Sequence, residues 1–300
     1  MTDSFAILRE QQTALDQRSD CTSSGFSVLS DWLALRVSGD DAESFLQNLL
    51  TNDVKAAQPG EAQLTGFCQA KGRLLAVFWL LRRQDDFVLL LPADQADFLT
   101  QRLSMFKLRS KVEISPLSDH LLLAITNNNA VNYTAKINNM LAFSIVSASD
   151  SEVVLAELEQ AGLSQQSRLC WLQPLIQAGY PMIYAESRER FTPQQVNLDL
   201  AGGVSFRKGC YPGQEVVARL HYLGEAKRRL FLGEVAVADL LPPGSDIVND
   251  TGEVAGQLVQ SCPLGDGRSL VQLSLKLAMA DQPLFLANNE ITEIRQLATN

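Results

Sequence analysis

The sequence has few of the residues on which much enzyme chemistry depends. It contains only two histidines, His120 and His221, which excludes a metal centre built from several imidazoles and leaves little for a Ser-His-Asp or Cys-His arrangement. The glycine-rich motifs that bind dinucleotides and phosphates do not occur, and neither does the Gly-x-Ser-x-Gly motif of hydrolases. The commonest signatures of nucleotide-dependent enzymes and serine hydrolases are therefore missing.

The cysteines are also few and scattered. Their number is odd and no two of them form a Cys-x-x-Cys motif, which argues against a disulfide framework and against a structural zinc site. We therefore expect no metal bound stably by this chain, and a reducing compartment. The five cysteines are Cys21, Cys68, Cys170, Cys210 and Cys262.

Long apolar runs and positive charge are lacking as well. The longest apolar run, residues 74–81, is 8 residues long, whereas a membrane-spanning helix needs about 20. The first 25 residues show no apolar core of a signal peptide. A net charge of −9 repels phosphate groups. We expect a soluble, cytoplasmic protein that binds neither a membrane nor nucleic acid directly.

Length and composition are typical of a globular chain with about two domains: 300 residues, of which 46% are hydrophobic and 20% charged. Helical and strand-like patterns alternate up to about residue 225. From Leu230 onward, short alternating segments separated by turn signals such as Pro242-Pro243-Gly244 indicate a small β-barrel. We expect helices over residues 38–50, 94–103 and 151–160, the last capped by Gly162. We expect strands over residues 74–81, 87–91, 121–125, 230–237, 253–260, 268–275 and 290–297. Residues 127–139 are expected to form a loop.

One segment, residues 208–219, concentrates unusual chemistry. Pro212-Gly213 suits the centre of a type II turn, and the chain after it can begin a helix in which Glu215 and Arg219 can pair. Cys210 then lies just before a helix N-terminus, beside two cations, and both features favour its thiolate form. The alternative, a small buried thiol among ordinary turn residues, stays open.

The same segment, Lys-Gly-Cys-Tyr-Pro-Gly-Gln-Glu-Val-Val-Ala-Arg, resembles the signature of the YgfZ-type folate-binding proteins linked to tRNA modification. These are related to the T-protein of glycine cleavage, an aminomethyltransferase. Other blocks similar to the family follow in order over residues 31–219. They are Asp31-Trp32 with Gly39, Phe45-Leu46-Gln47, Thr51-Asn52-Asp53-Val54, Ala70-Lys71-Gly72-Arg73, Trp171 with Ala178-Gly179-Tyr180-Pro181, and Phe191-Thr192-Pro193-Gln194 with Asn197-Leu198.

The resemblance implies an α+β, T-protein-like fold, with intertwined subdomains around a central cavity in residues 1–225, a subdomain boundary near 115–150, and a C-terminal barrel in 226–300. It also implies that tetrahydrofolate or a folate derivative occupies the cavity. Trp32 and Trp171 match the family's folate-associated tryptophans, and an indole offers a pterin both a flat face and an N–H donor. The alternative, that both are core residues, stays open; Trp79 is assigned to the core.

Two classes of function are consistent with the resemblance. An aminomethyltransferase needs a carboxylate near the reacting nitrogen, but Leu75 and Ala76 stand where T-proteins carry an Asp-Asp pair, and Gln177 replaces an acid of the third block. The other class is a folate-dependent accessory factor that supports iron–sulfur enzymes, including those that methylthiolate tRNA. We favour the accessory factor, with the one-carbon transferase as the alternative.

Within the motif, Cys210 is the expected reactive residue, and Lys208 is expected to hold its thiolate. A lone cysteine cannot hold an iron–sulfur cluster, which usually takes four thiolates. A third possible function is that of a cysteine hydrolase, for which His221 is the only candidate general base close to Cys210 in the sequence. The supporting residues are Gly209 (backbone contact to the thiolate), Tyr211, Gly213 (turn), Gln214 (amide to a ligand or partner), and Glu215 with Arg219 (helix start).

Two basic stretches could attract a folate polyglutamate tail or a macromolecular partner in this otherwise acidic chain. The alternative, a solvated basic face, stays open for both. The first stretch holds Arg102, Lys107, Arg109 and Lys111, and the second holds Arg207, Lys208, Arg219, Lys227, Arg228 and Arg229 against Glu215 and Glu225.

Overall fold

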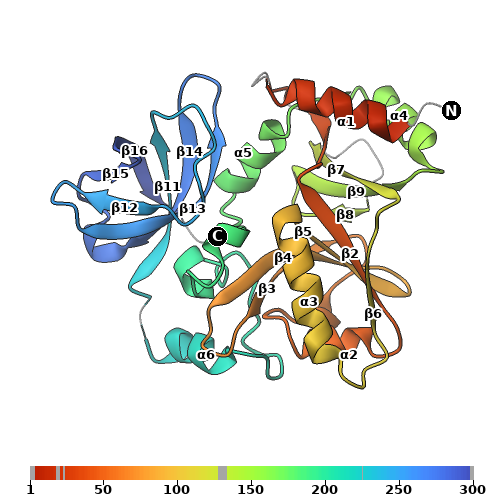
Figure 1. Ribbon diagram of the computed structural model, residues 1–300, viewed down its shortest axis with the longest axis horizontal. Helices are drawn as coiled ribbons and strands as arrows, with labels where there is room; N and C mark the ends of the chain where they lie inside the picture. Colours follow the sequence, from red (N-terminus) through yellow and green to blue (C-terminus); the bar gives the residue numbers. More distant parts are fainter. Residues whose placement is uncertain (1–3, 18–20, 23, 128–133, 225, 298–300) are drawn as a thin grey trace. The chain divides into compact units, whose positions relative to one another are not determined.

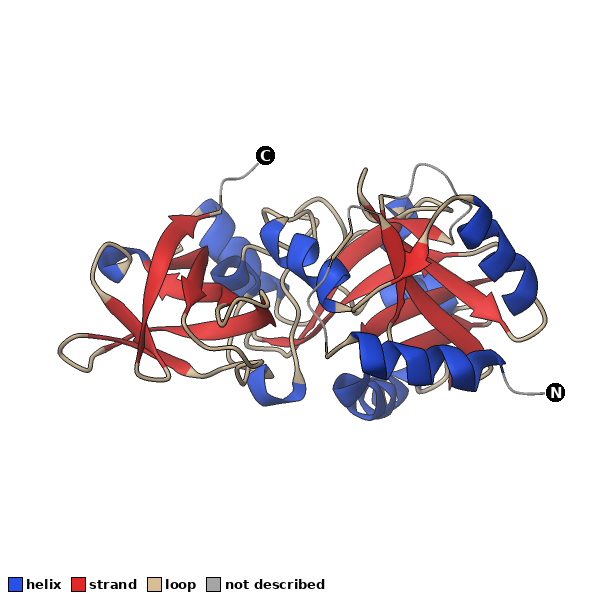
Figure 2. Ribbon diagram, turned by 90° about the horizontal axis from the view of Figure 1, so that it is seen from above, coloured by secondary structure: helices blue, strands red, loops and turns tan. Residues whose placement is uncertain are grey.

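A computed structural model describes residues 4–17, 21–22, 24–127, 134–224 and 226–297. Helices and strands are mixed along the chain (Figure 1; Figure 2), as expected for the α+β class. The chain divides into two compact units whose ranges interleave. Unit 1 is Met1–Glu43, Ala56–Gln63 and Trp79–Pro174, and unit 2 is Ser44–Lys55, Leu64–Phe78 and Leu175–Asn300.

One sheet lies wholly within unit 1. Its strand order is β10-β1-β7-β9-β8, and the helices α1 and α4 lie beside it (Figure 1). Phe5 and Leu8 of α1 and Leu158 of α4 share a core with alternate sheet residues such as Val28 and Leu123, because successive strand side chains point to opposite faces. The elements are α1 (Ser4–Leu15), β1 (Gly25–Val28), β7 (His120–Thr126), β8 (Ala135–Lys136), β9 (Leu141–Ser147), α4 (Ser151–Gln160) and β10 (Ser164–Gln165).

The second sheet has the order β3-β4-β5-β2-β6. Its central strands are the apolar runs recognised in the sequence: β4 is buried along all but its last residue, and β5 along its whole length. In unit 1, Trp79 of β4 pairs with Leu90, and Trp32 of β2 pairs with Pro92. The elements are β2 (Trp32–Ser38), β3 (Ala62–Cys68), β4 (Leu74–Arg82), β5 (Asp86–Pro92), η2 (Ala93–Gln95), α3 (Ala96–Lys107) and β6 (Glu113–Pro116).

The C-terminal part of unit 2 is a closed barrel with the order β11-β14-β13-β12-β15-β16, as the turn-separated segments predict. Its interior is filled by side chains from every strand, including Ile247, Leu258 and Leu273. Closure leaves no free sheet edge. The elements are β11 (Arg228–Val235), β12 (Asp246–Asn249), β13 (Val254–Pro263), β14 (Ser269–Lys276), η5 (Leu277–Met279), β15 (Leu284–Leu286) and β16 (Asn289–Gln296).

Short helices carry most of the motif blocks. α6 follows the Pro212-Gly213 turn as predicted, and α5 contains Pro174. The elements are α2 (Ala42–Gln47), η1 (Val54–Ala56), α5 (Leu169–Gln177), η3 (Ala185–Ser187), η4 (Pro193–Val196) and α6 (Gln214–Tyr222). Within the described ranges, no helix combines the length and apolar character needed to cross a bilayer.

Most predicted elements are present, with some differences in their bounds. The helix predicted over 151–160 is α4, and Gly162 ends it with φ +74°, the left-handed conformation that glycine adopts without strain. The helix predicted over 38–50 is only α2, because Leu50 instead bridges to Phe67 of β3. The predicted loop 127–139 contains the short strand β8; residues 128–133 of it lie outside the described residues.

Candidate functional site

The two predicted folate tryptophans meet in an aromatic cluster within unit 1. Trp32 is the first residue of β2, and Trp171 lies on α5. Their rings meet edge to face, with centroids 5.4 Å apart. Phe143 of β9 lies 5.4 Å from Trp171 and 6.0 Å from Trp32, and Trp79 contacts Phe143 at 6.2 Å. Three tryptophans distant in sequence therefore share one cluster.

Trp171 combines deep burial with an unsatisfied donor. Its side chain is 1% exposed, and its indole Nε1–H has no acceptor among the described residues. Neighbouring rings cover the indole, and its N–H is enclosed with them. A buried N–H without a partner costs roughly 1–3 kcal/mol, and a ligand oxygen would remove that cost.

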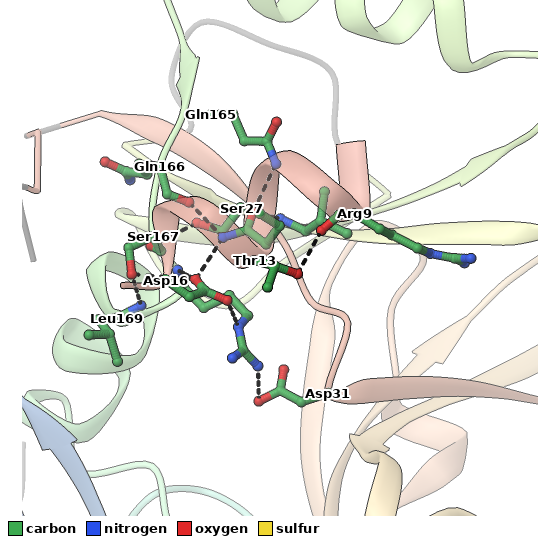
Figure 3. Close-up of polar contacts among 12 residues, drawn as sticks. Arg9, Thr13, Asp16, Ser27, Asp31, Gln165, Gln166, Ser167 and Leu169 are labelled. Carbon is green, nitrogen blue, oxygen red and sulfur yellow. Dashed lines mark hydrogen bonds and ion pairs between the residues drawn. The ribbon is translucent and has the colours of Figure 1, made fainter. Parts of the chain in front are cut away.

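An ion-pair network joins the elements that carry these tryptophans. Arg168, three residues before Trp171, pairs with Asp31, which directly precedes Trp32. Its guanidinium also pairs with Asp16, and its backbone N–H donates to the Asp16 carboxylate at 2.8 Å. Figure 3 shows Asp16 and Asp31 converging from two chain segments. The two carboxylates raise the pKa of Arg168 above its usual value although burial lowers it, so the pairs remain charged and fix both segments.

Sequence reasoning missed Arg168, although a signal was present. The arginine lies just before the first turn of α5, where the helix dipole disfavours a cation. A cation placed there needs acidic partners, and Asp31 was already among the family blocks. The partner Asp16 could not be chosen without the fold.

A disulfide also reaches this cluster and corrects the expectation drawn from scattered cysteines. Cys21 and Cys170 are bonded across a sequence separation of 149 residues, and Cys170 directly precedes Trp171. Pairing requires Cα atoms within about 7 Å, here 5.2 Å, and spacing along the chain carries no such information. The bond ties the segment after α1 to α5.

A cavity of about 350 Å³ opens beside Trp32 in unit 1. Residues of β1, β2, β7 and β9 line it, among them Val28, Leu122 and Ile145. The polar residues of its lining are Arg9, Ser30, Ser118 and His120. The volume is at the lower end of the range for small-molecule sites.

The predicted reactive cysteine lies in unit 2 and is exposed, whereas the other two free cysteines are buried. Burial raises the pKa of the Cys68 and Cys262 thiols to about 12, so both are inert at neutral pH. Cys210 is therefore the one accessible thiol among the described free cysteines, which argues against the alternative that it is a buried hydrophobic residue.

Lys208 is buried and contacts the main chain. Its ammonium donates to the carbonyl of Gln47, at the C-terminus of α2, and to that of Leu50 at 2.6 Å. Its Nζ also lies 5.2 Å from the centre of the Tyr211 ring. Burial lowers the pKa of Lys208 to about 8, partly opposed by the charge of Asp53. Lys208 thus anchors the motif to the 45–54 block, and its expected contact to the Cys210 thiolate stays a prediction.

Two motif blocks meet backbone to backbone at a pair of glycines. Gly213 has φ +83° and precedes α6, and a Cβ there would lie 2.5 Å from the Gln69 carbonyl oxygen and 2.7 Å from Gly72 Cα. Gly72 has φ +74°, and its Cβ would lie 2.9 Å from Val216. The 70–73 and 208–219 blocks therefore need glycine at both positions for their close approach.

Further contacts join one block to α6 and another to residues 202–203. Gln194 of η4 donates to the carbonyl of Val217 at 2.7 Å. Asn52 donates to the Gly202 carbonyl at 2.7 Å, and Thr51 to that of Gly203 at 2.7 Å. Three blocks from unit 2, through Gln47, Gly72 and Gln194, thus support the segment that presents Cys210.

The remaining motif residues are placed as follows. Tyr211 is buried, Gly209 is exposed, and Gln214 is the half-buried first residue of α6. Glu215 and Arg219 are exposed and no ion pair joins them in the structure; an exposed pair contributes at most about 1 kcal/mol.

His221 lies far from the position that a general base for Cys210 would need. Its ring stacks on Phe206 at 3.6 Å, near the C-terminal end of α6, whereas Cys210 precedes the N-terminal end. A helix of this length spans roughly 13 Å. This placement removes the support for a cysteine hydrolase.

The chain is similar in sequence to proteins named tRNA-modifying protein YgfZ. It is 28% identical to that of Shigella sonnei (strain Ss046), over 88% of this chain and 89% of the relative. It is also 28% identical to that of Cronobacter sakazakii (strain ATCC BAA-894), over 87% of this chain and 88% of the relative. The resemblance predicted from the motif blocks is confirmed. No protein-family model matches the chain.

The fold is that of the aminomethyltransferase of glycine cleavage. The crystal structure of glycine cleavage system aminomethyltransferase T from Bartonella henselae matches with a TM-score of 0.68 at 13% identity, over 95% of this chain and 86% of that one. At this identity the likeness shows the fold alone. The predicted T-protein-like fold with a C-terminal barrel is confirmed.

Proposed function

We propose that this chain is a folate-binding accessory protein that supports iron–sulfur enzymes and thereby tRNA modification, with Cys210 as its reactive residue. The relatives' name motivates the link to tRNA. The observation that carries the folate proposal is the Trp32–Trp171 pair, with an unsatisfied buried N–H and a cavity beside Trp32.

The residues present fit a tetrahydrofolate. Its pterin is flat and polar, with ring oxygen and nitrogen atoms that accept hydrogen bonds, so Trp171 Nε1–H would donate to it and the Trp32 indole would pack against it. The Arg168 network and the Cys21–Cys170 bond hold both indoles in place. A bound folate supplies one-carbon carrier chemistry.

The one-carbon transferase alternative has less support. The residues that replace the T-protein acids, Leu75 and Ala76, are both buried within β4, 2% and 0% exposed. Neither side chain can accept a hydrogen bond or stabilise a developing charge. We therefore propose binding without aminomethyl transfer.

Titration with tetrahydrofolate and its 5-formyl and 5,10-methylene derivatives tests the folate proposal. All three tryptophans lie in unit 1, so their fluorescence reports on the proposed site, and we expect quenching without product. Trp171→Phe removes the N–H but keeps a ring, and should weaken binding about tenfold. Trp79→Phe is the matched control with unchanged affinity. Product formation would favour the transferase.

Thiol labelling of the purified protein and complementation in cells test the role of Cys210. A maleimide under native conditions should label one thiol per chain, and Cys210→Ser should label none, because Cys68 and Cys262 are buried. In a knockout strain, Cys210→Ser should fail to restore tRNA methylthiolation, whereas Cys262→Ala should restore it. Full activity of Cys210→Ser would contradict the assigned role.

A further inference from the structure

The turn that follows α3 in unit 1 holds a leucine in a backbone conformation that favours glycine. The Ser110 N–H donates to the Lys107 carbonyl at 2.7 Å, which closes a four-residue turn with Leu108 at its first central position. Leu108 has φ 39° and ψ −103°, close to the type II′ geometry in which glycine is the usual residue at this position. A side chain there strains the backbone.

The Leu108 side chain does not contribute to the core. The residue is 91% exposed, and Met105 and Phe106 in the last turn of α3 are 61% and 40% exposed. Leu108 therefore gains little from burial that would offset its strain, and stability alone does not explain a leucine here. Strained residues cluster at sites of binding and switching, so this position indicates a contact with another molecule.

Cations alternate with these apolar side chains along the segment. The guanidinium of Arg102 contacts the Met105 sulfur at 3.9 Å, and no described acid forms an ion pair with Arg102, Lys107 or Arg109. The surface thus combines apolar side chains with positive charges that this acidic chain does not neutralise. We call it the α3-turn patch, and it consists of Arg102, Met105, Phe106, Lys107, Leu108 and Arg109.

We propose that the α3-turn patch binds an acidic, apolar segment of a partner protein. The inference rests on the proposed function, because an accessory protein must contact the enzyme that it supports, and it adds the surface and the chemistry of the partner. The apolar side chains of the patch would pack against those of the segment, and the three cations would pair with its carboxylates. Methionine, aromatic residues and arginine are enriched at protein interfaces.

The neighbouring acids favour a short protein segment over an anionic bilayer or an RNA. Asp40 pairs with Lys111 at 3.1 Å, and Asp41 accepts the Lys111 backbone N–H at 2.7 Å, so the unpaired cations end before Lys111. A bilayer surface or an RNA backbone would extend over these carboxylates and be repelled, whereas a short segment can contact the patch alone. Three apolar side chains offer less than the roughly 800 Å² that each partner of a standard interface buries, which favours a transient partner over a stable dimer.

Fluorescence anisotropy of a labelled peptide tests the inference on the full chain. The acidic probe is Glu-Leu-Glu-Asp-Phe-Leu-Glu-Asp-Leu-Glu, and its control has lysine at every acidic position. We expect the acidic probe alone to bind. Leu108→Gly should weaken it about tenfold, while the urea midpoint of unfolding stays unchanged or rises, because glycine adopts this conformation without strain. A purely structural role of the leucine would instead lower the midpoint.

Charge reversal and two matched controls complete the experiment. Arg109→Glu should weaken the acidic probe at least tenfold. The controls are Met140→Gly and Arg9→Glu, which change an exposed apolar residue and an exposed cation of unit 1 outside the patch, and both should keep the wild-type affinity. Phosphatidylglycerol vesicles and oligouridylate are tested in parallel. The inference is overturned if Leu108→Gly and Arg109→Glu weaken binding to either of these and not to the acidic probe.

Complementation of a knockout strain separates this inference from the proposed function. Leu108→Gly and Arg109→Glu should restore tRNA methylthiolation only in part, although both purified variants bind folate as the wild type does. If the wild type does not bind the acidic probe, or if both variants restore methylthiolation fully, the inference is overturned while the proposed function stands. Full restoration by Cys210→Ser would contradict the proposed function instead.

Discussion

Side chains of one kind in this molecule differ mainly in burial. Cys210, Cys68 and Cys262 carry the same thiol, yet the first is exposed and the pKa values of the other two rise to about 12. The sequence neighbours predicted Cys210 as the reactive thiol, and the structure shows it exposed. They did not show that the neighbouring Lys208 is buried and contacts two backbone carbonyls, because those acceptors lie about 160 residues away in the sequence.

Stability at alkaline pH should depend on the buried thiols. Between about pH 9, the usual pKa of a thiol, and the pKa of about 12 in the folded protein, Cys262 ionises in the unfolded chain but not in the folded one. This thiol alone therefore lowers the free energy of unfolding by about 1.4 kcal/mol per pH unit over this range. Cys262→Ala should reduce the fall by that amount, measured by urea unfolding with far-UV circular dichroism.

The control is Val271→Ala, which removes part of a buried barrel side chain that does not ionise. It should lower the stability at every pH and leave the slope of the wild type unchanged. An identical slope in wild type and Cys262→Ala between pH 9 and 12 would show that the Cys262 thiol is not shielded in the native barrel.

Secondary-structure elements were predicted where local patterns are strong. The apolar strands β4 and β5, the helix α4 with its glycine cap, and the turn before α6 all follow from local residues. The meeting of Gly72 and Gly213 does not, because close backbone approach depends on two segments about 140 residues apart. A motif glycine indicates that room is needed but not which segment occupies it.

Gly213→Ala should destabilise unit 2. The variant would hold a Cβ at φ +83°, 2.5 Å from the Gln69 carbonyl oxygen, and left-handed strain alone costs roughly 1–3 kcal/mol. We expect the free energy of unfolding to fall by at least about 2 kcal/mol, and α6 to lose its fixed position. Hydrogen exchange of the α6 amides and urea unfolding measure the two effects.

Gly209→Ala is the matched control from the same motif. Nothing lies within 4 Å of a Cβ there, so its stability should stay within about 0.5 kcal/mol of the wild type. Equal stability of both alanine variants would contradict the close packing of the two glycine segments.

At the scale of the whole molecule, features far apart in sequence converge in two places. In unit 1, the Trp32–Trp171 pair is held by the Arg168 network and by a disulfide. In unit 2, three motif blocks support the segment of Cys210. The family resemblance predicted the fold and these blocks, whereas the disulfide and the pairing of Arg168 with Asp16 depend on three-dimensional proximity alone.

Reduction of the Cys21–Cys170 bond should lower the stability of unit 1. In the chain-entropy model, a closed loop of this size stabilises the folded state by about 5 kcal/mol, and measured values for single bonds are generally 2–5 kcal/mol. Cys21→Ser changes an exposed residue, so it removes the bond with little change in packing. Tryptophan fluorescence should report the change, since every tryptophan lies in unit 1.

The measurement is urea unfolding with and without dithiothreitol. The wild type should lose stability when the dithiol is added, because each Cys sulfur gains a proton and electron as the reagent cyclises to its own disulfide. Cys21→Ser should already have the lower value and should not respond to the reagent. If reduced and oxidised wild type unfold at the same urea concentration, the bond does not stabilise the tryptophan cluster, and the Arg168 network alone must hold Trp171 beside Trp32.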